Sequence, residues 1–148
     1  MKSPLTPETV ATANDIVNLY KTFDYSAHTV DADKFIEMSV LADTLILDLR
    51  SESCFIEGHI KGAKHLGSDV TKESLEKQAP NLNTRILVYC TNSFLLSRKM
   101  SLTHTLVPQI YALGYQNLYY LDSLDLLTSV DFNRINKFQW EGKKIGEA

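Results

Sequence analysis

The stretch TLILDLRSESCFIEGHIKGAKHL, residues 44–66, decides the fold class of this chain. It opens with TLILDL, residues 44–49, where apolar side chains follow one another without polar alternation. Such a run is typical of a strand that is buried on both faces of a parallel sheet. The helix-like segment SESCFIEG, residues 51–58, follows directly. The stretch therefore predicts a strand followed by a helix.

Two later runs have the same apolar character, RILVYC at residues 85–90 and NLYYL at residues 117–121. Helical patterns lie between the three runs, in TKESLEKQ at residues 71–78 and in SRKMSLTHTLVPQIYALG at residues 97–114. Buried strands that alternate with helices indicate an α/β domain with a mainly parallel sheet flanked by helices. We expect the three runs to form adjoining or near-adjoining strands. Upstream, DADKFIEMS predicts a short helix capped by Asp31, while YSAHT is interpreted as a connection.

The composition is that of an ordinary globular protein and argues against two classes of main partner. The chain has 148 residues, of which 44% are hydrophobic and 22% charged, with a net charge of −3. The absence of a basic block argues against nucleic acid or an anionic membrane as a partner. The N-terminus lacks the apolar core of a signal peptide, and no stretch reaches the length of a membrane span. We therefore expect a cytoplasmic protein in which Cys54 and Cys90 are free thiols.

Residues 47–66 closely resemble the N-terminal half of a rhodanese-like domain. The resemblance is carried by two motifs. The first is an Asp-x-Arg triplet, here Asp48, Leu49 and Arg50. The second is an aromatic residue followed after three residues by a His-Ile-x-Gly-Ala pattern, here Phe55, His59, Ile60, Gly62 and Ala63, with Lys61 in place of the usual proline. Further along, the strand that ends in Cys90 matches the family's active-site strand. A helix, Leu-Gly-Tyr at residues 113–115 and a short strand complete the match, which covers roughly residues 30–130.

This resemblance implies a small three-layer α/β domain with a mainly parallel sheet of about five strands flanked by helices. Known members move a sulfane sulfur from a donor to the cysteine, as a persulfide, and then to an acceptor. The resemblance thus implies a sulfurtransferase in which Cys90 is catalytic and carries the persulfide. A catalytically silent rhodanese-fold module that binds or regulates a partner is the alternative, and phosphatase or arsenate reductase-type chemistry is a third. The fold alone does not choose among them.

The position of Cys90 favours chemistry at its thiol. The carboxyl end of a central parallel strand is where α/β sheets place ligands. Loop amides and the start of the following helix form an anion-binding nest there, which favours the thiolate and equally a persulfide. The candidate substrate-binding residues are those of the following loop and helix start: Thr91, Asn92, Ser93, Phe94, Leu95, Leu96 and Arg98.

The loop lacks the arginine that such sites usually carry. The family's sulfurtransferases commonly have glycine three residues and arginine five residues after the cysteine, where this chain has Ser93 and Leu95. Phosphatases need an arginine six residues after it, because a guanidinium grips phosphate bidentately, and this chain has Leu96. The nearest guanidinium belongs to Arg98. With Phe94 these leucines would form an apolar rim, so we expect weak activity with thiosulfate and a preference for an organic sulfane-sulfur donor or a persulfide-bearing protein.

The remaining polar residues of the first motif have structural interpretations. Asp48 and Arg50 are expected to form an ion pair that braces the strand end, His59 to hold a loop, as the resemblance implies, and Cys54 to pack in the core. A zinc site from the two cysteines with His59 and His65 is rejected because no ligand pair has zinc-site spacing. No metal and no cofactor are expected, and no oligomeric state is predicted.

The domain organisation follows from the extent of the resemblance. We expect an N-terminal helical extension at residues 1–29 that packs on the domain. The rhodanese-like domain is placed at residues 30–141 and a polar C-terminal tail at residues 142–148. Either Phe138 or Trp140 is expected to pack back on the domain.

Overall fold

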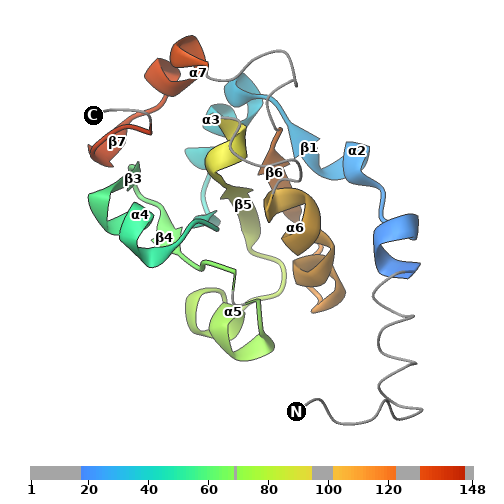
Figure 1. Ribbon diagram of the computed structural model, residues 1–148. Helices are drawn as coiled ribbons and strands as arrows, with labels where there is room; N and C mark the ends of the chain where they lie inside the picture. Colours follow the sequence, from blue (N-terminus) through green and yellow to red (C-terminus); the bar gives the residue numbers. More distant parts are fainter. Residues whose placement is uncertain (1–17, 69, 95–101, 123–130, 146–148) are drawn as a thin grey trace, which may run out of the picture.

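A computed structural model describes residues 18–68, 70–94, 102–122 and 131–145 (Figure 1). Its main sheet has five strands in the order β1-β6-β5-β2-β4, and every pairing is parallel. The strands are β1 (Thr29–Val30), β2 (Thr44–Asp48), β4 (Lys64–His65), β5 (Arg85–Tyr89) and β6 (Leu118–Leu121). The three apolar runs are therefore direct neighbours in the sheet, as their sequences predict.

Helices cover both faces of this sheet, which confirms the three-layer α/β architecture (Figure 1). On one face lie α5 (Lys72–Gln78) and α6 (Leu102–Ala112), and on the other lie α3 (Ala32–Ser39) and α7 (Phe132–Lys137). Successive side chains of a strand point to opposite faces. Val88 and Cys90 accordingly lie in the cluster with α5 and α6, while Leu87 and Tyr89 lie in the cluster with α3 and α7.

Side chains at the N-terminal cap positions start three of the helices. The Asp31 carboxylate accepts a hydrogen bond from the N–H of Lys34 at the start of α3, as predicted. Thr71 and Ser74 form a reciprocal capping box at the start of α5. Ser51 caps α4 (Glu52–Glu57).

The connection predicted over YSAHT contains structure that its sequence did not reveal. It forms the short helix α2 (Tyr25–His28) and then strand β1 at the sheet edge. Before it, residues 18–22 are helical, and the Tyr20 hydroxyl accepts a hydrogen bond of 2.8 Å from Gln109 of α6. The described end of the N-terminal extension thus contacts the domain, while residues 1–17 lie outside the described chain.

A second, two-stranded antiparallel sheet joins β3 (Gly58–Ile60) to β7 (Trp140–Gly142). Beyond it, the backbone N–H of Lys143 donates to the Glu57 carbonyl over 2.9 Å. The segments around Gly58 and Lys143 pass so closely that any side chain at Gly58 would collide with the backbone of Lys143. Phe138 is buried and Trp140 packs against the same core cluster, so both aromatic residues return to the domain.

Candidate functional site

Cys90 directly follows β5, whose neighbours in the sheet are β6 and β2. A single 3-10 turn, η1 (Thr91–Ser93), comes next, and residues 90–94 are called the thiol loop below. The backbone N–H of Ser93 is shared between the Cys90 carbonyl, 3.1 Å away, and the Cys90 sulfur, and the Cys90 N–H donates to Ser93 Oγ over 3.4 Å. Ser93 Oγ in turn donates to the Leu121 carbonyl over 3.3 Å. The thiol loop therefore folds back on the thiol and directs a peptide N–H at its sulfur.

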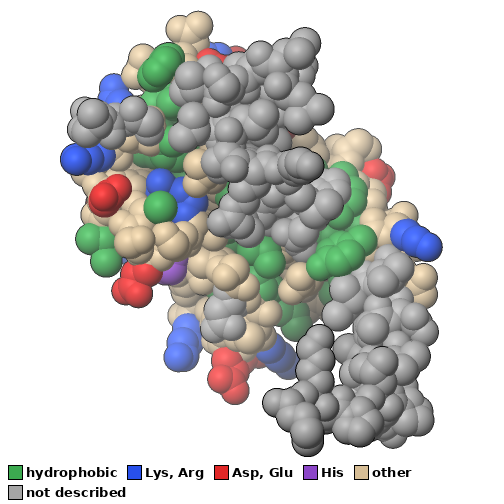
Figure 2. Space-filling model, in the orientation of Figure 1, with side chains coloured by type: hydrophobic (Ala, Val, Ile, Leu, Met, Phe, Trp, Pro, Cys, Tyr) green, Lys and Arg blue, Asp and Glu red, His purple; other side chains and the backbone are tan. Residues whose placement is uncertain are grey.

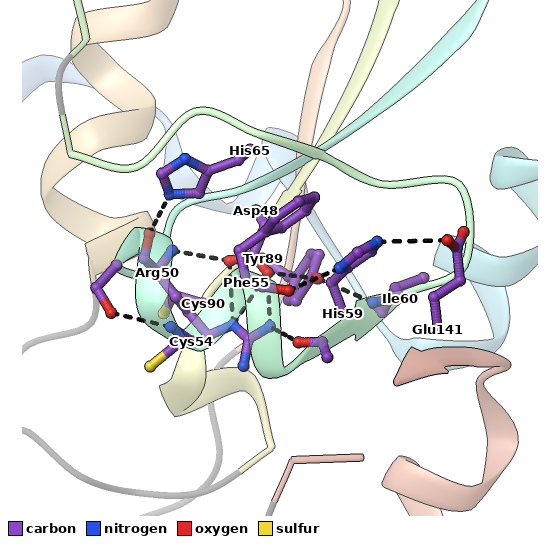
Figure 3. A network of polar contacts seen from close by, with 12 residues as sticks. Asp48, Arg50, Cys54, Phe55, His59, Ile60, His65, Tyr89, Cys90 and Glu141 are labelled. Carbon is purple, nitrogen blue, oxygen red and sulfur yellow. Dashed lines mark hydrogen bonds and ion pairs between the residues drawn. The ribbon is translucent and has the colours of Figure 1, made fainter. Parts of the chain in front are cut away.

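Asp48 and Arg50 form the expected ion pair beside this loop (Figure 3). Arg50 Nε lies 3.1 and 3.0 Å from the two Asp48 carboxylate oxygens, and Arg50 Nη2 lies 2.7 Å from Oδ2. Nη2 also donates to the Gly58 carbonyl over 2.6 Å, which ties β2 to β3. Burial opposes the charged guanidinium, but the hydrogen bonds and charge of Asp48 outweigh it and raise the pKa of Arg50.

Tyr89 extends the same network through its hydroxyl. The hydroxyl donates to Asp48 Oδ2 over 2.7 Å and accepts from the Ile60 N–H over 3.0 Å. Burial and the neighbouring Asp48 carboxylate raise the pKa of Tyr89, because both disfavour the phenolate. The side chain is therefore a neutral donor that fixes the end of β2 against β3.

The two motif histidines hold backbone carbonyl groups. His59 Nδ1 donates to the Phe55 carbonyl over 2.8 Å, and the His59 ring stacks on Phe55 with centroids 3.8 Å apart. His65 Nε2 donates to the Arg50 carbonyl over 2.8 Å. Because a carbonyl oxygen only accepts, these contacts assign the protonated nitrogen of each ring. Within the described residues no group of three or more potential ligands is placed to hold a metal ion.

A small pocket of about 170 Å³ opens beside the thiol loop. Its walls come from α4 and the residues on either side of it, the thiol loop and the segment after β7: Arg50, Cys54, Glu57, Gly58, Thr91, Lys143, Lys144 and Ile145. Arg50 is only 7% exposed, and its Nη1 contacts no acceptor within the described residues. Figure 3 shows this nitrogen directed away from the Asp48 network. Three basic residues and one acidic residue thus line a pocket that reaches the thiol loop at Thr91, which suits an anionic group.

Cys54 is half-buried in the wall of this pocket, so the expectation that it packs in the core is wrong. Ser51 caps α4, which begins at Glu52, and this register places Cys54 in the pocket wall.

The thiol loop residues are placed differently from one another. Thr91 lines the pocket, Asn92 contributes its backbone to η1, and Ser93 is fully buried as a brace of the loop. Phe94 is also fully buried, with its ring 5.2 Å from that of Phe138 and 5.3 Å from that of Trp140. This placement corrects the expectation that Phe94 forms an apolar rim, because aromatic side chains from the C-terminal segment surround it. Leu95, Leu96 and Arg98 lie outside the described residues.

Sequence reasoning missed Arg134, which reaches the thiol loop from α7. Its Nη1 donates to the Ser93 carbonyl over 2.9 Å and to the Asp122 carbonyl over 2.8 Å. Its Nη2 lies 2.7 Å from Asp122 Oδ1, as an ion pair and not as an aligned hydrogen bond. The stretch DFNRINK carries the signal of an amphipathic helix, which does not reveal what its arginine contacts.

Residues 31–123 match the rhodanese-like domain family, and the fold agrees with this match. The chain therefore belongs to the rhodanese-like domain family. A search of curated proteins found no significant match.

Solved structures with the same fold include rhodanese-like proteins at low sequence identity. The Alr3790 protein from Anabaena sp. is 18% identical with a TM-score of 0.55, and the match covers 76% of this chain and 91% of that one. A thiosulfate sulfurtransferase from Pseudomonas aeruginosa is 20% identical with a TM-score of 0.58, over 78% of this chain and 20% of that one. A variant of EanB in complex with ergothioneine covalently linked with a persulfide is 18% identical with a TM-score of 0.58, over 78% of this chain and 28% of that one. These likenesses concern the fold. In the described parts of the chain, no helix is long and apolar enough to cross a bilayer.

Proposed function

We propose that this protein is a sulfurtransferase in which Cys90 carries sulfane sulfur as a persulfide. The observation that carries the proposal is the Ser93 N–H directed at the Cys90 sulfur, at the carboxyl end of a central strand. An N–H donor stabilises an anionic sulfur more than a neutral thiol. A thiolate that attacks and a persulfide that forms are both anions, so both gain from this loop.

The reaction has two balanced steps. The Cys90 thiolate attacks the sulfane sulfur of the donor, and the donor's sulfur–sulfur bond breaks with its electron pair on the leaving group. The result is a Cys90 persulfide anion and the reduced donor. A nucleophilic acceptor then attacks the outer sulfur, and Cys90 leaves as a thiolate.

The charges around the pocket support an organic or protein-borne donor more than thiosulfate. The charge of Arg50 is already matched by Asp48, and the amines of Lys143 and Lys144 belong to exposed residues. A doubly charged, strongly hydrated anion loses much hydration on entry and needs matching buried charge. A singly charged organic donor needs less, and the free Nη1 edge of Arg50 can meet one carboxylate or sulfonate. We therefore propose a small organic sulfane-sulfur donor or a persulfide-bearing partner protein, in the cytoplasm.

Intact-mass measurement after exposure to a sulfane-sulfur donor tests the proposal. We expect a gain of one sulfur, about 32 mass units, that maps to Cys90. The gain should vanish in Cys90→Ser and persist in Cys54→Ser. A gain that maps only to Cys54, or no gain with thiosulfate, an organic persulfide or a polysulfide, would refute the assignment.

The second candidate is a non-enzymatic binding module of the same fold. One observation favours it, because Cys90 is only 1% exposed, which restricts access to its sulfur. A module of this kind would give no sulfur uptake with any of these donors, so the same experiment separates the two candidates.

A further inference from the structure

The segment that follows the family match contacts the thiol loop at several points. The helix α7 lies beyond residues 31–123, and two of its groups bind backbone atoms of the loop. Arg134 Nη1 donates to the Ser93 carbonyl over 2.9 Å, and the N–H of Asp131, which caps α7, donates to the Phe94 carbonyl over 3.1 Å. The two carbonyl groups at the end of η1 therefore both receive donors from the C-terminal segment.

We propose that Arg134 is a positioning residue for Cys90 and acts through Ser93. This role rests on the proposed chemistry of Cys90 and deepens it by assigning what holds the loop. A single 3-10 turn has few internal hydrogen bonds and poor hydrogen-bond geometry, so its orientation depends on outside contacts. Ser93 presents its N–H to the thiol sulfur and its carbonyl to Arg134, so the guanidinium fixes the residue that orients the N–H.

The geometry at Arg134 requires a guanidinium. One nitrogen, Nη1, serves both the Ser93 carbonyl and the Asp122 carbonyl, and Nη2 is held by the Asp122 carboxylate. The Arg134 side chain is 14% exposed, so water competes little for these contacts. The contacts join the thiol loop to the end of β6, the neighbouring strand. A lysine offers one ammonium without a planar fork and cannot reproduce all three contacts.

The test compares Arg134→Ala with Lys137→Ala. Both residues lie on α7 and both pair with an aspartate, but Lys137 pairs with Asp33 over 3.0 Å at an exposed position away from the loop. Alkylation of Cys90 by iodoacetamide is followed against pH by peptide mapping. If Arg134 only braces the structure, its replacement changes how easily iodoacetamide reaches Cys90 and therefore changes the plateau rate of alkylation. A residue that positions the Ser93 N–H changes the pH at which the rate is half its plateau.

We expect Arg134→Ala to move the midpoint to higher pH by roughly half a unit to one unit, as loss of one oriented donor implies. Lys137→Ala should superimpose on the unmodified protein, and Arg134→Lys should fall between. An unchanged midpoint in Arg134→Ala, or an equal shift in Lys137→Ala, would overturn the inference. If Arg134→Ala does not fold, the comparison of Arg134→Lys with Lys137→Ala decides by the same criterion. Sulfur uptake measured in parallel is a separate result, so its absence would refute the proposed function without altering the midpoints.

Discussion

Replacing Tyr89 by phenylalanine isolates the energetic contribution of one hydroxyl in the network beneath the site. The hydroxyl donates to Asp48 Oδ2 over 2.7 Å and accepts from the Ile60 N–H over 3.0 Å. The Tyr89 ring is fully buried and packs against Phe94 with centroids 6.1 Å apart. Phenylalanine keeps that ring and creates no large cavity, so Tyr89→Phe removes only the two hydrogen bonds.

The two lost bonds do not cost the same. The Ile60 N–H is left buried without this acceptor, at a cost of about 1–3 kcal/mol. Asp48 Oδ2 still accepts from Arg50 Nε and Nη2, so its lost bond costs about 1 kcal/mol. We expect Tyr89→Phe to lower the free energy of unfolding by about 2–4 kcal/mol.

Two matched tyrosines calibrate this value in urea unfolding. The Tyr115 hydroxyl makes one neutral hydrogen bond of 2.7 Å to the Ala79 carbonyl, so Tyr115→Phe should cost about 1 kcal/mol. Tyr119 is half-buried and its hydroxyl has no hydrogen-bond partner in the described chain, so Tyr119→Phe should change stability by less than about 0.5 kcal/mol. The reasoning is refuted if Tyr89→Phe costs no more than Tyr115→Phe.

Three further predictions concern pH, charge and substrate. Because the pKa of Tyr89 is raised in the folded protein, the contribution of Tyr89 to stability is complete below the pKa of the unfolded chain, about 10, and declines as the pH rises above that value. The midpoint of urea unfolding should therefore fall less steeply above about pH 10 in Tyr89→Phe than in the unmodified protein. Replacing both Lys143 and Lys144 by alanine should raise the KM for anionic donors and leave that for uncharged dialkyl polysulfides nearly unchanged. Equal effects on both donor classes would exclude a charge role. Thiosulfate turnover should be weak and should rise in Leu95→Arg by about one to two powers of ten, with Cys90→Ser inactive in either background; fast turnover by the unmodified protein would contradict the charge argument.

The central sheet could be predicted because its signals are local. Each of β2, β5 and β6 is an unbroken apolar run, and such runs need only their own side chains to be recognised. The Asp31 cap and the ion pair of Asp48 with Arg50 also depend on residues close in sequence. The family resemblance placed Cys90 at the strand end for the same reason.

The parts that could not be predicted depend on residues distant in sequence. The strands β3 and β7 have only three residues each and exist because they pair with one another. Arg134 reaches Ser93 across 41 positions, a contact that no pattern around either residue encodes. The opposite placements of Phe94 and Cys54 follow from the path of the thiol loop and from the start of α4, which the side-chain types alone do not specify.

The pairing of β3 with β7 has a consequence for the order in which the protein matures during synthesis. The five parallel strands all precede residue 122, so their residues are synthesised before the segment from 131 to 145. Until then Phe94 lacks its Phe138 and Trp140 neighbours, and the Ser93 carbonyl lacks Arg134. Contacts of large sequence separation form late because their loop closure costs entropy first. We therefore expect folding to complete the surroundings of the thiol last, after the sheet has formed.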